Sequence, residues 1–156
     1  MPESIEARVQ LLEDELALRN LLARYAFNAD MGRARAYADL YTEDGAIDLK
    51  DMDGPRFEGR ESIYSDFITQ PMATAAAGRT FHQASPTVFH IDGDNATGEG
   101  FGTVLYLGED GSMTIVQGTY NHWTFRRVDG EWLIAERDFR QMGSPEASTM
   151  FVKSVN

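Results

Sequence analysis

The sequence predicts an α+β fold: a cone-shaped domain in which N-terminal helices pack on the concave face of a curved antiparallel sheet, with an internal pocket between them. Two observations support this prediction. Apolar residues recur with helical spacing over 5–29, and after residue 80 runs of β-branched and aromatic residues alternate with tight turns. The length of 156 residues suits a single domain, 1–156, with a core over about 5–142 and a tail over 143–156.

The first helix is expected to run from Ile5 to about Ala29. Its apolar residues step by four, three and four positions and then continue toward the helix end: Ile5, Val9, Leu12, Leu16, Leu21, Leu22 and Tyr25. Ser4 is a plausible N-terminal cap, and Gly32 supplies the left-handed turn that ends a helix. This helix is one of those expected to lie against the sheet.

Shorter elements are expected between this helix and the main sheet. They are a helix over about 34–41, a turn at 42–45, a short strand at 46–49, a break at 51–55, a helix from 59 to about 67 and a mobile loop over 69–79. A four-stranded meander then follows over about 80–91, 96–107, 112–127 and 131–140, because tight-turn sequences divide these runs. Strands of this length must twist and curl.

Composition narrows the classes of partner and location. The formal net charge of −11, from 25 acidic and 14 basic residues, repels phosphate backbones and anionic lipid headgroups. The absence of cysteine excludes a disulfide scaffold, a thiol nucleophile and a thiolate metal site. The N-terminus lacks a signal-peptide pattern, and no stretch is apolar enough to span a membrane. We therefore expect a cytoplasmic protein with no nucleic-acid or membrane partner.

Two residues are candidates for chemistry. Among three histidines in predicted strands, His82 lies near a strand start beside small residues, although a strand histidine is more often structural. Asp30 ends the first helix, where the negative end of the helix dipole gives a carboxylate no stabilisation. Asp30 is either a solvated acid or a buried one that needs a partner, and histidine is the natural partner. An Asp–His pair would orient the imidazole for proton transfer at neutral pH.

Several segments resemble SnoaL-like domains of the nuclear transport factor 2-like (NTF2-like) superfamily over about residues 5–142. They are LARYAFNAD (22–30), ADLYTEDG (38–45), FEGRESI (57–63), GTYN (118–121) and DGEWLI (129–134). The closest resemblance is to the branch that holds scytalone dehydratase, bile acid 7α-dehydratase and hexachlorocyclohexane dehydrochlorinase. Those enzymes use a Tyr-x4-Asp element and a sheet histidine, which match Tyr25, Asp30 and His82.

The resemblance implies a role for each matching residue. His82 would act as general base and then acid, Asp30 would orient it, and Tyr25 would polarise a substrate oxygen. An arginine of the last strands, Arg140 or else Arg127, would steady negative charge. The second catalytic histidine of scytalone dehydratase has no clear equivalent here.

An apolar pocket is expected to receive a small hydrophobic or polycyclic substrate. Its candidate lining residues, each of which could equally be ordinary core, are Phe27, Tyr41, Phe67, Phe101, Tyr120 and His122. No metal or cofactor is expected, since the acids Asp48, Asp51 and Asp53 lack the glutamate that completes a calcium loop.

The sequence therefore favours a cofactor-independent lyase or isomerase, of the dehydratase, dehydrochlorinase or ketosteroid-isomerase type. Two alternatives stay open: a non-catalytic ligand-binding or oligomerisation module, and the small subunit of a ring-hydroxylating dioxygenase. A homo-oligomer, dimer or trimer, is expected because alternation places Val104, Val116 and Phe125 on an open sheet face that needs cover.

Overall fold

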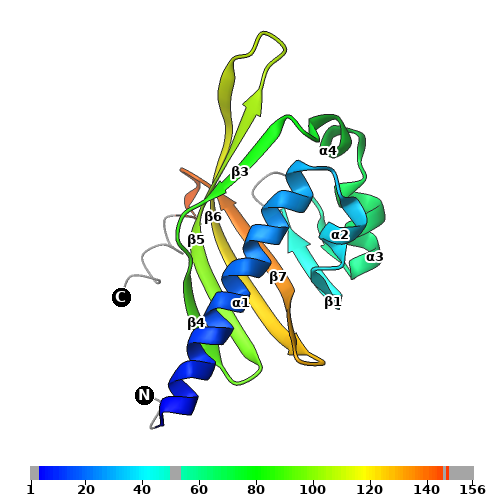
Figure 1. Ribbon diagram of the computed structural model, residues 1–156. Coiled ribbons are helices and arrows are strands. Elements are labelled where there is room, and N and C mark those ends of the chain that lie inside the picture. The colour runs from blue at the N-terminus through cyan, green and yellow to red at the C-terminus, as the bar shows by residue number, and fades with distance from the viewer. Residues whose placement is uncertain (1–3, 50–53, 146, 148–156) are drawn as a thin grey trace.

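The protein is built on one seven-stranded sheet with helices along one face (Figure 1). The computed structural model describes residues 4–49, 54–145 and 147. Along the sheet the strand order is β2-β1-β7-β6-β5-β3, and β4 also pairs with β5. Part of the expected break at 51–55 and most of the expected tail at 143–156 lie outside the described residues. No described helix is long and apolar enough to cross a membrane.

Helix α1 (Ile5–Asp30) has the predicted extent and cap. The Ser4 hydroxyl accepts a hydrogen bond of 3.1 Å from the backbone N–H of Ala7. The helix lies across the sheet and buries Leu18, Leu21 and Tyr25 against it. Its first apolar stripe does not face the sheet: Ile5, Val9, Leu12 and Leu16 are all at least 46 % exposed. The inward position in this half is taken by Asp14.

The buried Asp14 explains why the first half of α1 turns its apolar stripe outward. Its carboxylate accepts a hydrogen bond from the Trp132 indole at 3.2 Å and forms an ion pair with Arg127 at 2.8 Å. A buried carboxylate is tolerated only with such partners. This polar contact, rather than apolar periodicity, therefore sets which face of the helix meets the sheet.

The segment after α1 differs from the prediction. Helix α2 (Ala34–Ala38) is shorter than expected, and strand β1 (Tyr41–Asp48) occupies the residues predicted as a turn at 42–45. Strand β1 pairs antiparallel with β2 (Arg56–Glu58) but parallel with β7 (Glu131–Gln141). The sheet is therefore mixed, and the expectation of a wholly antiparallel sheet was wrong for this pair.

Three short helices complete the layer above the sheet. Helix α3 (Arg60–Ser62) runs into the π-helix η2 (Ile63–Ile68), which together occupy the predicted third helix. Residues 69–79 were expected to be a mobile loop, but they contain helix α4 (Pro71–Ala76), which begins with proline at a position where no N–H is needed. These helices pack beside α2 at one end of the sheet (Figure 1).

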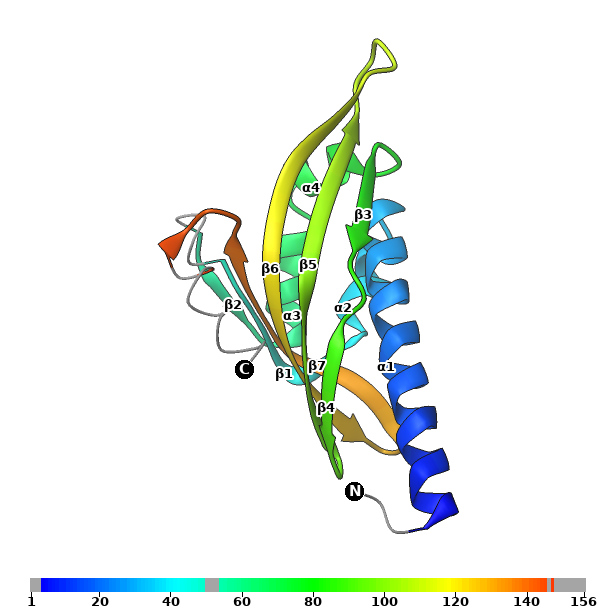
Figure 2. The ribbon, with the colours of Figure 1, turned by 90° about the vertical axis from the view of Figure 1, so that its left-hand side faces the viewer.

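The predicted meander is present, but its first strand is divided into two. Its strands are β3 (Thr80–Ala84), β4 (Val88–Asp92), β5 (Asn95–Leu107), β6 (Met113–Val128) and β7. The first expected strand is split into β3 and β4 around Pro86, which has no N–H to donate to a ladder. The long strands twist strongly, and the β5–β6 hairpin extends past the helices (Figure 2).

A β-bulge in β7 decides which side chains point toward the helices. Thr124 pairs with Glu136 and Phe125 pairs with Ile134, so Ala135 is an extra residue in β7. Before the bulge Ile134 is buried; beyond it Arg137 and Phe139 are the buried residues. The bulge thus reverses the inward and outward alternation along the strand.

The three residues expected to form one apolar sheet face do not share one. Val104 lines a pocket, Phe125 is buried in the core and Val116 is 55 % exposed. Val116 and Phe125 are nine positions apart on β6, so alternation alone places them on opposite faces. The ladder also pairs Val104 with Gln117 and Leu105 with Ile115, so Val116 is the extra residue of a bulge.

Candidate active site

The structure brings Asp30 and His82 into contact. The Asp30 Oδ1 atom lies 2.5 Å from His82 Nδ1, and both carboxylate oxygens accept from the His82 backbone N–H, at 2.9 and 3.2 Å. The Asp30 side chain is 9 % exposed. Because a carboxylate accepts but does not donate, Nδ1 carries the proton in this contact. The expectation that the two residues are close is met.

Local geometry explains why Asp30 is held here. Asp30 is the last residue of α1, and its own carbonyl accepts a hydrogen bond of 2.6 Å from the backbone N–H of Gly78, just before β3. Gly78 has φ 73°, a left-handed conformation that favours glycine. Main chain and side chain of Asp30 therefore both tie the end of α1 to the start of β3, which carries His82.

His82 opens onto a pocket between α1 and the sheet. Among the described residues Nε2 of His82 has no hydrogen-bond partner, and the ring lines the pocket with Leu22, Tyr25 and Ala26 of α1. The cavity volume is about 50 Å³. One water needs about 10–15 Å³ on this measure, so the space accommodates one small ring.

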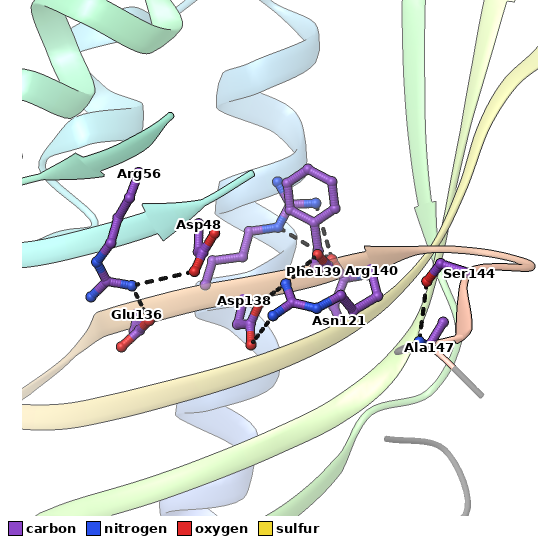
Figure 3. A network of polar contacts seen from close by, with 10 residues as sticks. Asp48, Arg56, Asn121, Glu136, Asp138, Phe139, Arg140, Ser144 and Ala147 are labelled. Atoms are coloured by element: carbon purple, nitrogen blue, oxygen red, sulfur yellow. Dashed lines mark hydrogen bonds and ion pairs between the residues drawn. The ribbon is translucent and has the colours of Figure 1, made fainter. Parts of the chain in front are cut away.

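The pocket arginine is Arg137, not Arg140 or Arg127. Arg137 is 9 % exposed and lines the pocket. Arg140 points away, toward Asp138, on the opposite face of β7 (Figure 3). Arg127 pairs with Asp14 and Asp94, away from the pocket. The choice of Arg140 was wrong because the bulge at Ala135 reverses the alternation that spacing alone predicts.

Arg137 is held by one amide and three aromatic rings. Its Nε and Nη2 donate to the Asn121 side-chain oxygen at 3.2 and 3.0 Å. The guanidinium carbon lies 4.5 Å from the Phe139 ring centroid and 5.3 Å from those of Tyr25 and Trp123. Burial lowers the pKa of Arg137, but the neighbouring phenols, Tyr25 first, raise it by more. The net shift of the pKa is upward, so the guanidinium is charged.

Tyr25 stands between the pocket and a buried group of phenols. It is 6 % exposed, lines the pocket and packs edge-to-face on Trp123. Its ring centroid is 4.9 Å from that of Tyr37, which in turn lies 5.8 Å from that of Tyr41. Burial raises the pKa of both Tyr37 and Tyr41 well above the ordinary value, so both hydroxyls are neutral. Neither hydroxyl has a hydrogen-bond partner among the described residues.

Most of the residues expected to line the pocket lie elsewhere. Phe27 is 65 % exposed, Tyr41 is core, and Phe67 packs between Phe57 and Tyr37. Phe101 borders the pocket, but its ring packs edge-to-face on Tyr120.

His122 and Tyr120 are also excluded from the pocket lining. Each neighbours an inward residue of β6, Asn121 or Trp123, so both point to the other side of the sheet. Asn121 and Thr119 were missed, and alternation from Trp123 could have found them.

His122 forms a second histidine–carboxylate contact on that other side. Its Nδ1 lies 3.3 Å from the Glu99 carboxylate, and Asp138 is its neighbour on β7. Burial raises the pKa of Asp138, and Asp48 and Glu136 add to this effect, while Arg140 opposes it. Figure 3 shows Arg56 paired with Asp48 and Glu136, and Arg140 paired with Asp138. No group of three His, Asp or Glu side chains in the described part of the chain could hold a metal ion.

The fold and pocket define an NTF2-like α+β protein. More specifically, a model of the SnoaL-like domain matches residues 10–138, so the chain belongs to the SnoaL-like family. A search of curated proteins finds no match.

Solved structures show the same architecture. An NTF2-like protein with a cystatin-like fold from Novosphingobium aromaticivorans is 28 % identical, with a TM-score of 0.85 over 96 % of this chain and 98 % of that chain. Rv3472 from Mycobacterium tuberculosis, a protein of unknown function, is 26 % identical, with a TM-score of 0.73 over 86 % and 80 %. Aln2 from a Streptomyces species is 17 % identical, with a TM-score of 0.71 over 91 % and 96 %, and supports the fold alone.

Proposed function

We propose that this SnoaL-like domain is a cofactor-independent lyase or isomerase that moves a proton with the His82–Asp30 pair. The observation that carries the proposal is the 2.5 Å contact between His82 Nδ1 and Asp30, which leaves Nε2 free at the pocket. The presence of Tyr25 in the same lining supports a relationship to the dehydratase and dehydrochlorinase branch.

The reaction begins with removal of a substrate proton. Nε2 of His82 accepts the proton from a carbon next to a carbonyl group, and Asp30 stabilises the imidazolium that forms. The electron pair of that C–H bond moves onto the carbonyl oxygen, where Arg137 and Tyr25 stabilise the negative charge. These two residues take the role that the sequence had assigned to Arg140 and Tyr25.

The second half of the reaction decides its class. In an isomerase, His82 returns the proton to a different carbon. In a dehydratase it gives the proton to a leaving hydroxyl, and water departs as the carbon–carbon double bond forms. In a dehydrochlorinase chloride leaves instead, and the proton stays on His82 until solvent removes it. The small cavity favours substrates with one ring in each case.

Deuterium exchange tests the first step without knowledge of the natural substrate. The protein is incubated in D₂O with cyclohexanone, a small single-ring ketone with exchangeable α-protons, and their loss is followed by NMR. Replacing a general base costs about 10²–10⁴-fold, so His82→Gln should lose most of the catalysed exchange. His122→Gln is the matched control and should keep it. Equal exchange by wild type and His82→Gln would overturn the proposal and favour a ligand-binding module.

A further inference from the structure

We infer that the substrate carries an acidic oxygen, most simply a carboxylate, that binds Arg137 in its ionised form before any chemistry occurs. This inference rests on the pocket of the proposed function but concerns ground-state binding rather than proton transfer. It names a substrate class: a small molecule with one apolar ring and one anionic group.

The first support is a buried cation without a buried anion. Arg137 is 9 % exposed, and the acceptor of its Nε and Nη2 hydrogen bonds is neutral, the Asn121 amide oxygen. By contrast, Arg127 of β6 and Arg140 of β7 each have a carboxylate partner. A charge removed from water is costly unless it is paired. A bound anion would supply the missing partner.

The aromatic contacts of Arg137 do not replace that partner. The rings of Phe139, Tyr25 and Trp123 attract the cation through their faces, by about 0.5–2 kcal/mol each. They hold the guanidinium in place, but a ring face neutralises no charge and accepts no bidentate hydrogen bond. An oxyanion does both, with shorter and stronger bonds than a neutral oxygen.

The second support is the charge of the pocket wall. Among the described residues its lining contains no carboxylate, although the whole chain has a net charge of −11. Within that described lining, Arg137 is the only permanently charged group. Asp30 lies behind His82 and is occupied by three contacts with it. An anion that enters the pocket therefore meets a cation and no competing negative side chain.

The third support is a glycine that positions the amide beside Arg137. At Gly102 of β5 a Cβ atom would lie only 2.8 Å from Asn121 Nδ2 and 2.9 Å from Thr119 Oγ1. Glycine therefore lets these two side chains pack closely against the β5 backbone, which holds the Asn121 amide in place beside Arg137. The apolar ring of the ligand would lie in the pocket between Leu22 and Trp123.

Binding of two isosteric probes tests the inference. Benzoate and benzamide differ in charge but hardly in shape, and the affinity of each is measured by titration of amide NMR signals at about pH 8, where unperturbed histidine is mostly neutral. Wild type should bind benzoate at least tenfold more tightly than benzamide. Arg137→Gln should abolish this difference, whereas Arg137→Lys should keep part of it.

The controls separate this inference from the proposed function. Arg140→Gln removes an arginine from the opposite face and should leave the preference for benzoate intact. His82→Gln, which should lose exchange, should also keep the preference. If wild type binds both probes equally, or if Arg137→Gln retains the preference, the inference is wrong, and the wild-type comparison decides even if Arg137→Gln fails to fold. Neither result would alter the exchange test of His82.

Discussion

Two histidine–carboxylate contacts lie on opposite faces of one sheet, and they differ less in exposure than in surroundings. The side chains of His82 and His122 are 28 % and 31 % exposed, so exposure does not distinguish them. The Nδ1–oxygen distance is 2.5 Å for His82–Asp30 and 3.3 Å for His122–Glu99. Asp30 also binds the backbone N–H of His82, whereas Glu99 shows no such second contact to His122 among the described residues. Both contacts join a histidine to a carboxylate, so the residue types do not identify the candidate site. It is identified by the cavity beside Nε2 of His82 and by the second bond that fixes the Asp30 carboxylate.

The largest expected difference between the two contacts comes from their carboxylates. Asp30→Asn should lower catalysed exchange of cyclohexanone by about 10²–10⁴-fold, because an amide can stabilise the wrong imidazole tautomer. Glu99→Gln should change it by less than about twofold, as for a surface substitution away from the site. Rates are compared at saturating ketone. Similar losses in both variants would show that the outer contact also matters.

The two arginines of β7 provide the next comparison. Arg137→Gln should lower kcat/KM for exchange by about 10²-fold, the usual cost of losing one group that stabilises an oxyanion. Arg140→Gln should leave kcat/KM nearly unchanged, since its side chain faces Asp138 across the sheet from the pocket. Steady-state kinetics on matched preparations measures both. A larger loss for Arg140→Gln would contradict the register described for β7.

Asp14 is a buried carboxylate that stabilises the fold, in contrast to Asp30 in the candidate site. Burial alone raises the pKa of Asp14, but hydrogen bonds from Arg127, Trp132 and Gln10 outweigh it, so the net shift is downward. A carboxyl with a lowered folded pKa stabilises the fold above its unfolded pKa, and this contribution is lost as pH falls through the folded value. Asp14→Asn should therefore cost about 1–3 kcal/mol of unfolding free energy near pH 7 and less near pH 3.

Urea unfolding at both pH values measures this effect. Asp14→Asn should retain cyclohexanone exchange, in contrast to Asp30→Asn. A cost that does not shrink at low pH would mean that the Asp14 charge is not what stabilises the fold.

A substitution in the exposed apolar stripe of α1 should have the smallest effect on the pocket. Homo-oligomerisation remains a prediction, and Ile5, Val9, Leu12 and Leu16 offer a surface for it because their four-three-four spacing matches the seam of paired helices. We expect a second copy of the chain to bind this stripe. Leu12→Glu should lower the mass found by light scattering to that of a monomer while exchange continues. A wild-type monomer would end this prediction.

The sequence predicted those parts of the fold that depend on local chemistry. Helix α1 and the hairpins of the meander follow from capping, periodicity and turn residues. The second half of strand β1 was predicted as a short strand at 46–49, but its first half was missed because Thr42-Glu43-Asp44-Gly45 has the composition of a turn. Pairing with β7, about ninety residues away, makes this half part of a strand.

The candidate site shows the same division. Spacing placed Asp30 at a helix end and His82 in a strand, but resemblance to known enzymes was needed to place them together. Arg137 could not be found by alternation, since the bulge at Ala135 has no glycine or proline to announce it. A one-residue shift exchanges the two faces of a strand, so Arg140 was chosen instead.

The protonation pattern of His82 tests the pairing in the pocket most directly. Long-range ¹H–¹⁵N NMR near pH 8 distinguishes the two neutral tautomers of each histidine. The contact with Asp30 predicts that His82 carries its proton on Nδ1 and leaves Nε2 free as a base, and that Asp30→Asn removes this bias while Glu99→Gln does not. A wild-type His82 with its proton mainly on Nε2, or one unaffected by Asp30→Asn, would contradict the assignment of these two residues as the acid/base pair.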